Sequence, residues 1–331
     1  MSMDIDIVIP WVDDSDEKWR KEYLQYKPGA NCDSDEARYR DWNVFKYWFR
    51  GIEKYAPWVR KIHFLTYGHI PSWLDTTNPK LNIVNHKDFI PEKYLPTFSS
   101  HPIELNMHRI PDLAEHFIYF NDDVYLTQPT KPEDFFVDGK PVDTAVMAVV
   151  DNEDNTNFMP YIMLNILGII NMEFPKKKTI KNNKSKWFSP KYGKGMLKNM
   201  YLYPFKYFTG FSIYHSCNSF CKSTFEKVWD KNEDTLDLTC SHKFRSKEDV
   251  NQYLMRFYQL CEGNFCPHKS DSTYVTIGNE TMETIETYLY DSSYKVVCIN
   301  DDPMGFDFET EKAKLENIME KKFGEKSSFE L

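Results

Sequence analysis

The sequence predicts an α/β protein with a mainly parallel, Rossmann-like sheet, helices on both faces, and a mixed lysine- and aromatic-rich insertion or lid. Two observations support this fold class. Short apolar runs rich in β-branched residues alternate with segments whose apolar side chains recur at helical spacing. Strands that alternate with helices need crossover connections, which make neighbouring strands parallel. Ligands of such sheets bind beyond the carboxyl ends of the strands.

The first strand is expected at residues 5–12, IDIVIPWV, a buried run that leads into a turn rich in aspartate. A helix is expected at 40–55, where Trp42, Phe45 and Phe49 recur at offsets of three and four. The other expected elements are strands at 61–67, 80–85, 116–126 and 295–299, and helices at 103–113, from 246 onward and before the carboxyl end. We expect three parts: an α/β core (1–150), the insertion or lid (151–230) and a C-terminal part that completes the site and the core (231–331).

Composition restricts how a nucleotide could be held. Only 12 of the 331 residues are glycine, and neither GxGxxG nor GxxxxGK[ST] occurs. Any diphosphate must therefore be bound without a glycine-rich loop. Aromatic residues are abundant, with 24 Phe, 21 Tyr and 8 Trp, and most are expected in the core. Trp11 is the exception, because it ends a strand beside three aspartates and could pack against a sugar ring.

The net charge of −9 excludes a general nucleic-acid binder, but the charge is uneven. Residues 174–225 contain eleven lysines and no acid, so this segment is either a solvated loop or a surface for an anionic partner. Seven cysteines without a CxxC motif suggest reduced thiols rather than zinc ligands or a disulfide framework. The acidic first residues do not resemble a signal peptide, and the apolar run 158–174 is interrupted by asparagines, so a cytoplasmic protein is expected.

Several short motifs could carry chemistry, and each has a structural alternative. Asn121-Asp122-Asp123 follows an apolar strand and could hold Mg²⁺ or Mn²⁺, or it could form an Asx turn. The same choice applies to Asn300-Asp301-Asp302, which could instead cap the last helix. His215 could be a general base or a structural histidine. Arg245, in the sequence SHKFR, could bind phosphate or pair with a surface carboxylate.

Four stretches, in this order along the chain, resemble the conserved blocks of the Stealth family of sugar-1-phosphate transferases. They are DIVIPWVDDSDEKW (6–19), the region from RYRDWNVFKYWF to PEDFF (38–136), CSHKFRSKEDVNQYL (240–254) and CINDD (298–302). The family contains enzymes of bacterial capsule and surface-glycan synthesis and the animal lysosomal-enzyme GlcNAc-1-phosphotransferase. The resemblance implies transfer of a hexose or N-acetylhexosamine 1-phosphate from a UDP-sugar to a glycan hydroxyl, with release of UMP. The alternatives are a glycosyltransferase that releases UDP and a glycan-binding module without activity.

The resemblance also implies roles for individual residues. Those implied for the nucleotide sugar are Trp11, Val12, Asp13, Arg38, Asp41 and Arg109, and those implied for Mg²⁺ or Mn²⁺ are Asp122 and Asp302. The catalytic residues implied are Asp123, His215 and Arg245. Arg245 is expected to neutralise the β-phosphate, whereas either Asp123 or His215 would be the general base. The family often has TDGQ where this chain has TYGH (66–69), so polar contacts at Tyr67 are not carried over.

The implied partners are a UDP-sugar donor and a glycan acceptor that is carried on a lipid. We therefore expect the protein in the bacterial cytoplasm, with a peripheral contact at the inner face of the membrane. The lysine-rich segment would then meet anionic lipid headgroups. No nucleic-acid partner is expected.

Overall fold

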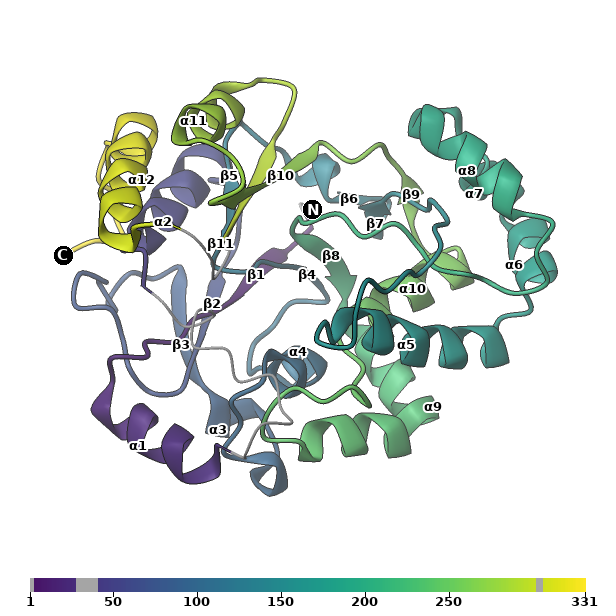
Figure 1. Ribbon diagram of the computed structural model, residues 1–331, viewed down its shortest axis with the longest axis horizontal. Helices are drawn as coiled ribbons and strands as arrows, with labels where there is room; N and C mark the ends of the chain where they lie inside the picture. Colours follow the sequence, from purple (N-terminus) through teal and green to yellow (C-terminus); the bar gives the residue numbers. More distant parts are fainter. Residues whose placement is uncertain (1–2, 28–40, 302–305) are drawn as a thin grey trace.

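A five-stranded sheet lies at the centre of the computed structural model, which describes residues 3–27, 41–301 and 306–331 (Figure 1). Its strand order is β3-β2-β1-β4-β8, with bounds β1 Ile5–Pro10, β2 Ile62–Thr66, β3 Leu81–Asn85, β4 His116–Tyr119 and β8 Asn218–Cys221. The first four strands are parallel, and β8 runs antiparallel to β4. The expected α/β class with a mainly parallel sheet is confirmed.

Alternating side chains along the strands divide the core into two layers. Ile5, Ile7 and Ile9 of β1 face one layer, and Val8 faces the other. Helices α2 (Phe45–Tyr55), α11 (Met282–Tyr290) and α12 (Phe308–Phe323) pack in the first layer. The second layer contains α3 (His86–Phe89), α4 (Ser100–Leu105), α5 (Met159–Glu173), α9 (Lys222–Ser241) and α10 (Tyr253–Glu262). Figure 1 shows α11 and α12 on the opposite side of the sheet from α5 and α10.

Two smaller sheets complete the strand arrangement. One has the order β10-β11-β5, with bounds β10 Ser272–Ile277, β11 Val296–Asp301 and β5 Val124–Leu126. The other consists of β6 (Phe136–Val137), β7 (Lys140–Asp143) and β9 (Cys266–Pro267). The prediction of one strand at 116–126 was wrong, because the chain leaves the central sheet after Tyr119 and joins β11 at Val124. The turn that crosses between the two sheets contains Asp122 and Asp123.

Two helix predictions also need correction. The helix expected at 103–113 is replaced by α4 and a 3-10 turn at Met107–Arg109. The helix expected from 246 begins only at Tyr253, because Asp249 caps a separate turn by accepting the Ser246 N–H at 2.9 Å. Helix α1 (Glu17–Tyr26) starts where Asp16 accepts the Trp19 N–H at 2.7 Å.

The lysine-rich segment contains three helices at the edge of the molecule, α6 (Lys176–Asn182), α7 (Lys184–Trp187) and α8 (Lys194–Leu202) (Figure 1). Its role as a lid and the division of the chain into three parts remain predictions. Across the described residues, we find no helix with both the length and the apolarity that a membrane span requires. The six cysteines within the described part of the chain are free thiols.

Candidate active site

The acidic turn between β4 and β5 carries an incompletely satisfied carboxylate. Asp123 Oδ2 accepts a weak hydrogen bond from the Cys298 Sγ at 3.3 Å. Asp123 Oδ1 is buried, and no donor among the described residues reaches it. A buried carboxylate oxygen without a donor is costly unless a cation binds it. This turn is therefore the part of the site that fits a metal ion best.

The acidity of this turn is reduced by its surroundings. Burial raises the pKa of Asp123 to about 6, although the Cys298 thiol opposes the shift. The Asp122 side chain reaches solvent, but the protein around it and the neighbouring Asp123 carboxylate raise its pKa to about 7. Two adjacent carboxylates that resist ionisation together would be stabilised by a divalent cation.

Further carboxylates approach this turn from the end of β1 and the start of α2. Asp41 contributes to the raised pKa of Asp122 and to that of Asp14. Burial is the main cause at Asp14, and Asp13 adds to it. Asp41 itself is exposed, and its Oδ1 accepts the Asn43 N–H at 2.6 Å. The predicted residues Asp13, Asp41 and Asp122 thus lie along one acidic edge of the sheet.

Trp11 and Val12 lie at the carboxyl end of β1 and are half-buried. The Trp11 ring stacks on Phe45, with centroids 6.0 Å apart, and makes a T-shaped contact with His69 at 5.3 Å. Because the Asp13 N–H donates to His69 Nε2 at 2.9 Å, His69 fixes the backbone next to Trp11. Burial lowers the pKa of His69, so this acceptor is neutral at pH 7.

The end of β11 brings a second group of polar residues to the same place. The Ile299 N–H donates to the Asp123 carbonyl at 2.9 Å, which joins this strand to the acidic turn. Trp42 Nε1 donates to Asp301 Oδ2 at 3.1 Å. His215 is exposed and stacks on Tyr274 with centroids 4.1 Å apart, and the Asn300 side chain approaches the Tyr274 hydroxyl at 3.4 Å. His215 is thereby connected through Tyr274 to Asn300 at the end of β11.

Arg245 approaches from the loop between α9 and α10. It is half-buried, and its Nη2 donates to the Ser100 Oγ at 3.1 Å. Burial and the carboxylates of Glu104 and Asp122 raise the pKa of Tyr119, whereas Arg245 lowers it. Arg245 and Asp122 thus both lie within electrostatic range of the Tyr119 hydroxyl.

Asp249 holds the Arg245 loop in place. It is fully buried, and its two oxygens accept hydrogen bonds from His101 Nδ1 and His242 Nδ1, both at 2.7 Å. The Ser246 N–H adds a third hydrogen bond at 2.9 Å. A carboxylate with this many donors fixes the loop on both sides of Arg245.

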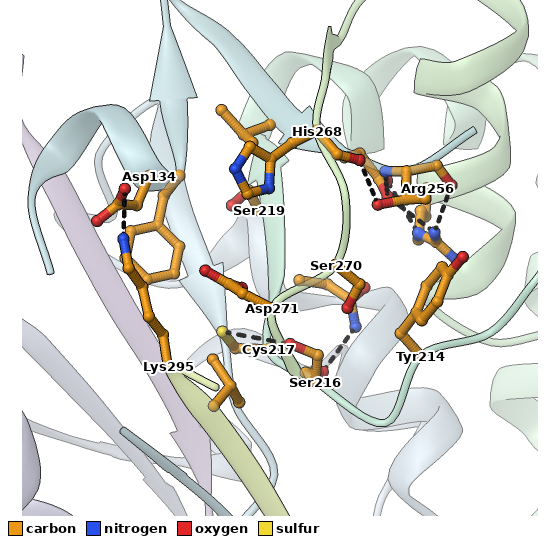
Figure 2. A pocket seen from close by; sticks show the side chains of 16 residues that line it. Asp134, Tyr214, Ser216, Cys217, Ser219, Arg256, His268, Ser270, Asp271 and Lys295 are labelled. Atoms are coloured by element: carbon orange, nitrogen blue, oxygen red, sulfur yellow. Dashed lines mark hydrogen bonds and ion pairs between the residues drawn. The ribbon is translucent and has the colours of Figure 1, made fainter. Parts of the chain in front are cut away.

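A polar cavity of about 70 Å³ lies beside the segment that carries His215 (Figure 2). Arg256 forms a two-pronged ion pair with Asp143, with both contacts at 2.8 Å, and also donates to the Ser212 carbonyl. It therefore ties the segment before His215 to β7. Lys295 pairs with Asp134 at 2.8 Å on one side of the cavity. Burial raises the pKa of Asp271, which lines the same cavity.

One predicted site residue, Arg109, lies away from this place, and two others cannot be located among the described residues. Arg109 is exposed, donates to Asn106 Oδ1 at 3.0 Å and lies over the Trp229 ring at 5.0 Å. These contacts place it at the amino-terminal half of α9. Arg38 and Asp302 lie outside the described residues. Within the described part of the chain, no group of three metal-ligating side chains is assembled.

Sequence reasoning did not identify Asp249, His69 or Tyr274 as parts of the site. Asp249 had a visible signal, since Ser246 and Asp249 form a capping pattern, but that pattern was assigned to a helix start. His69 was present in the TYGH stretch, where only its neighbour Tyr67 was considered. Tyr274 had no signal in the sequence, because its role depends on stacking with a residue 59 positions away.

Comparison with known proteins identifies the family. Residues 3–30 match "Stealth protein CR1, conserved region 1", and residues 38–143 match "Stealth protein CR2, conserved region 2". The chain is 42% identical to the capsular polysaccharide phosphotransferase WcwK of Streptococcus pneumoniae over 98% of both chains. The chain belongs to the Stealth family. The predicted family resemblance is confirmed, and with it the assignment to the transferases.

Other relatives of this Stealth protein have related names. It is 37% identical to the receptor polysaccharide phosphotransferase WefC of Streptococcus gordonii, over 99% of both chains. It is also 37% identical to the exopolysaccharide phosphotransferase cps2G of Lactiplantibacillus plantarum, over 99% of this chain and 96% of that one. Among solved structures, the galactosyltransferase LgtC is similar with a TM-score of 0.40 and 10% identity, over 96% of this chain and 95% of that chain.

Proposed function

We propose that this Stealth protein transfers a hexose or N-acetylhexosamine 1-phosphate from a UDP-sugar to a glycan hydroxyl. The acceptor oxygen attacks the β-phosphorus, the bond between the two phosphates breaks, and UMP leaves as a phosphodiester forms. The names of the full-length relatives support a role in capsule or surface polysaccharide synthesis. The observation that carries the proposal is the buried Asp123 oxygen that no donor among the described residues reaches, with Arg245 in electrostatic range of the neighbouring Tyr119.

In this proposal the nucleotide sugar binds at the carboxyl ends of β1 and β2. Trp11, Val12, Asp13 and Asp41 support this placement, since they lie along that edge. Val12 packs against the aromatic cluster that contains Phe244, the residue before Arg245. A donor bound along β1 would therefore have its phosphates beside the Arg245 guanidinium, whose fork suits phosphate oxygens. Arg38 and Arg109 remain candidates for the nucleotide by family resemblance alone.

Asp122 and Asp123 are the residues that would hold Mg²⁺ or Mn²⁺, with Asp302 as a further candidate. The orphaned Asp123 oxygen and the raised pKa values of both aspartates fit a divalent cation with oxygen ligands. Such a cation would supply neutralisation of the diphosphate charge. Arg245 contributes a fixed positive charge to the same phosphates and needs no proton exchange to do so.

We assign the general base to His215 and leave Asp123 as a metal ligand. Although the His215 side chain reaches solvent, the protein around it desolvates the ring and lowers its pKa, so the imidazole is neutral at pH 7 and able to accept a proton from the acceptor hydroxyl. Its ring is exposed to an incoming acceptor and is oriented by the stack on Tyr274. Arg256, through the Ser212 carbonyl, restrains the segment that presents it.

We place the reaction in the bacterial cytoplasm, at the inner face of the membrane, with a lipid-linked glycan as the acceptor. Incubation with UDP-sugars and a glycan acceptor tests the reaction, because chromatography separates UMP from UDP. The proposal predicts UMP, formed only when acceptor and divalent metal are present. UDP as the product would identify a glycosyltransferase, and no nucleotide product from any UDP-sugar would favour a glycan-binding module.

A further inference from the structure

Exposed apolar side chains gather on α8 and the loop that follows it. Five such side chains lie within residues 197–207: Leu197 (60% exposed), Met200 (56%), Tyr201 (79%), Phe205 (51%) and Tyr207 (54%). A folded chain normally buries such residues or spaces them singly. We call residues 194–207 the α8 face.

The helix itself is amphipathic with its apolar stripe facing outward. At about 100° per residue, Leu197, Met200 and Tyr201 share one side of α8, and Lys194 and Lys198 border it. The opposite side holds Leu202 and Asn199, which are buried. An exposed apolar stripe with lysines along one border has the composition of helices that lie in a membrane interface.

The α8 face is held rigidly from beneath. The fully buried Asn199 side chain donates to the Ala145 and Trp187 carbonyls at 2.7 and 2.6 Å and accepts the Met147 N–H at 2.6 Å. Lys176 is also buried, and its ammonium donates to the Leu202 and Tyr207 carbonyls at 2.7 and 3.1 Å. The exposed side chains of this face therefore do not belong to a loosely held segment, because the two buried polar side chains Asn199 and Lys176 fix the backbone that carries them.

The loop after α8 has a further anchor. Asn171 on α5 accepts the Phe208 N–H at 2.8 Å and donates to the Phe208 carbonyl at 3.0 Å. Phe205 and Tyr207 are thus held in place between two fixed points, Leu202 and Phe208. Ordering exposed aromatic rings gives no benefit to a monomer in water, but it lowers the entropic cost of binding a surface.

The chain segment that carries the α8 face has only positive charges. Between residues 174 and 225 the chain has no acid. Seven exposed lysines of this segment form no ion pair with a carboxylate of the described residues: Lys178, Lys181, Lys184, Lys191, Lys194, Lys198 and Lys206. Since the whole chain is −9, the rest of it carries a strong negative charge. An anionic surface would attract this side of the molecule and repel the others.

We propose that the α8 face docks on an anionic lipid bilayer, with Leu197, Met200 and Tyr201 in the headgroup region and the lysines against lipid phosphates. A second copy of this chain fits the face less well, because a symmetric contact would set its lysines against the same lysines. This proposal rests on the proposed function in one respect: membrane docking would bring the site to a lipid-linked acceptor. Binding itself needs neither nucleotide sugar nor acceptor.

Sedimentation with vesicles tests the proposal. We expect the full chain to bind vesicles that contain phosphatidylglycerol, to bind pure phosphatidylcholine vesicles at least about tenfold less, and to be released by salt. The double substitution Leu197→Ser with Tyr201→Ser should weaken vesicle binding by about tenfold or more, because both positions then bury less apolar area in the bilayer. Lys194→Gln with Lys198→Gln should lose roughly fivefold per lysine.

A matched control uses the same residue types elsewhere on the surface. Leu238→Ser with Tyr290→Ser changes two side chains that are 46% and 49% exposed, and it should bind vesicles as the unchanged chain does. Equal binding of the α8-face variants and the unchanged chain would overturn the proposal. So would self-association that these variants abolish in the absence of lipid. Neither result would affect UMP release with a water-soluble acceptor, which tests the proposed function separately.

Discussion

Two aspartates on either side of the site have opposite surroundings. Asp249 accepts hydrogen bonds from two imidazoles and a backbone N–H, so neither of its oxygens lacks a donor. Asp123 accepts one weak hydrogen bond from a thiol, and its second oxygen is buried without a donor from the described residues. The satisfied carboxylate stabilises the fold and positions Arg245. The unsatisfied one lowers stability, and the metal ion that we propose would satisfy it.

The largest effect should come from Asp123→Asn, which keeps the shape of the side chain and removes its charge. Turnover should fall by about a thousandfold, because a bound metal contributes several kcal/mol of charge stabilisation. Thermal unfolding should show equal or higher stability, since a buried carboxylate without a donor is lost. UMP release and calorimetry on the same preparation measure both. A large loss of stability would mean that Asp123 belongs with Asp249 as a structural residue.

Replacement of Arg245 with alanine tests the role of the side chain that the Asp249 hydrogen bonds hold in position. We expect turnover to fall by about 100- to 1,000-fold, as when one preorganised charge partner of a transition state is removed. Arg245→Lys should recover only part of this, because an ammonium lacks the two-pronged geometry. Steady-state rates of UMP release for both variants provide the measurement. Near-normal rates in the alanine variant would remove Arg245 from the site.

The main effect of Asp249→Ala should be a loss of stability. Removal of this carboxylate leaves His101 and its partner histidine without their acceptor, and the loss of a buried charged network costs about 3–5 kcal/mol. Denaturant unfolding measures this directly. At a temperature where the variant remains folded, turnover should fall by less than in Arg245→Ala, because the guanidinium is still present but less well oriented. A turnover loss without a stability loss would instead give Asp249 a direct role in chemistry.

The smallest effect should appear in the pH dependence of stability. In the metal-free chain the folded pKa values of Asp123 and Asp122 are raised to about 6 and about 7, above the ordinary value of 3.8. Between pH 4 and pH 7 the folded state therefore holds protons that the unfolded state has lost, so these groups make stability fall as pH rises. Mn²⁺ should restore stability more at pH 8 than at pH 5. Melting curves in Asp123→Asn should show a weaker slope and a smaller metal effect.

The α/β fold could be predicted from the sequence where local patterns decide the structure. The run IDIVIP forms β1 because its side chains are buried on both faces, and the stripe on α2 follows from helical spacing. The split of 116–126 into β4 and β5 could not be foreseen. Both halves are apolar, and only pairing with β11, 170 residues away, separates Val124 from Tyr119.

The site was predictable in part for the same reason. Acids at strand ends and the SHKFR loop have local signals, and they indicated Asp122, Asp123 and Arg245. The stacking of His215 on Tyr274 and the role of Asp249 depend on contacts between distant segments. The sequence also did not separate the buried Lys176 from the exposed lysines around it, because only tertiary packing turns one ammonium inward.

The fate of the β-phosphorus of the donor tests the central claim most directly. A UDP-sugar labelled at that atom should be incubated with the metal-loaded protein and a glycan acceptor, and the products separated by size. The account predicts that the label moves to the glycan, in a bond that resists phosphatase, while unlabelled UMP is released. Label that remains in free UDP while the sugar moves to the glycan would contradict it.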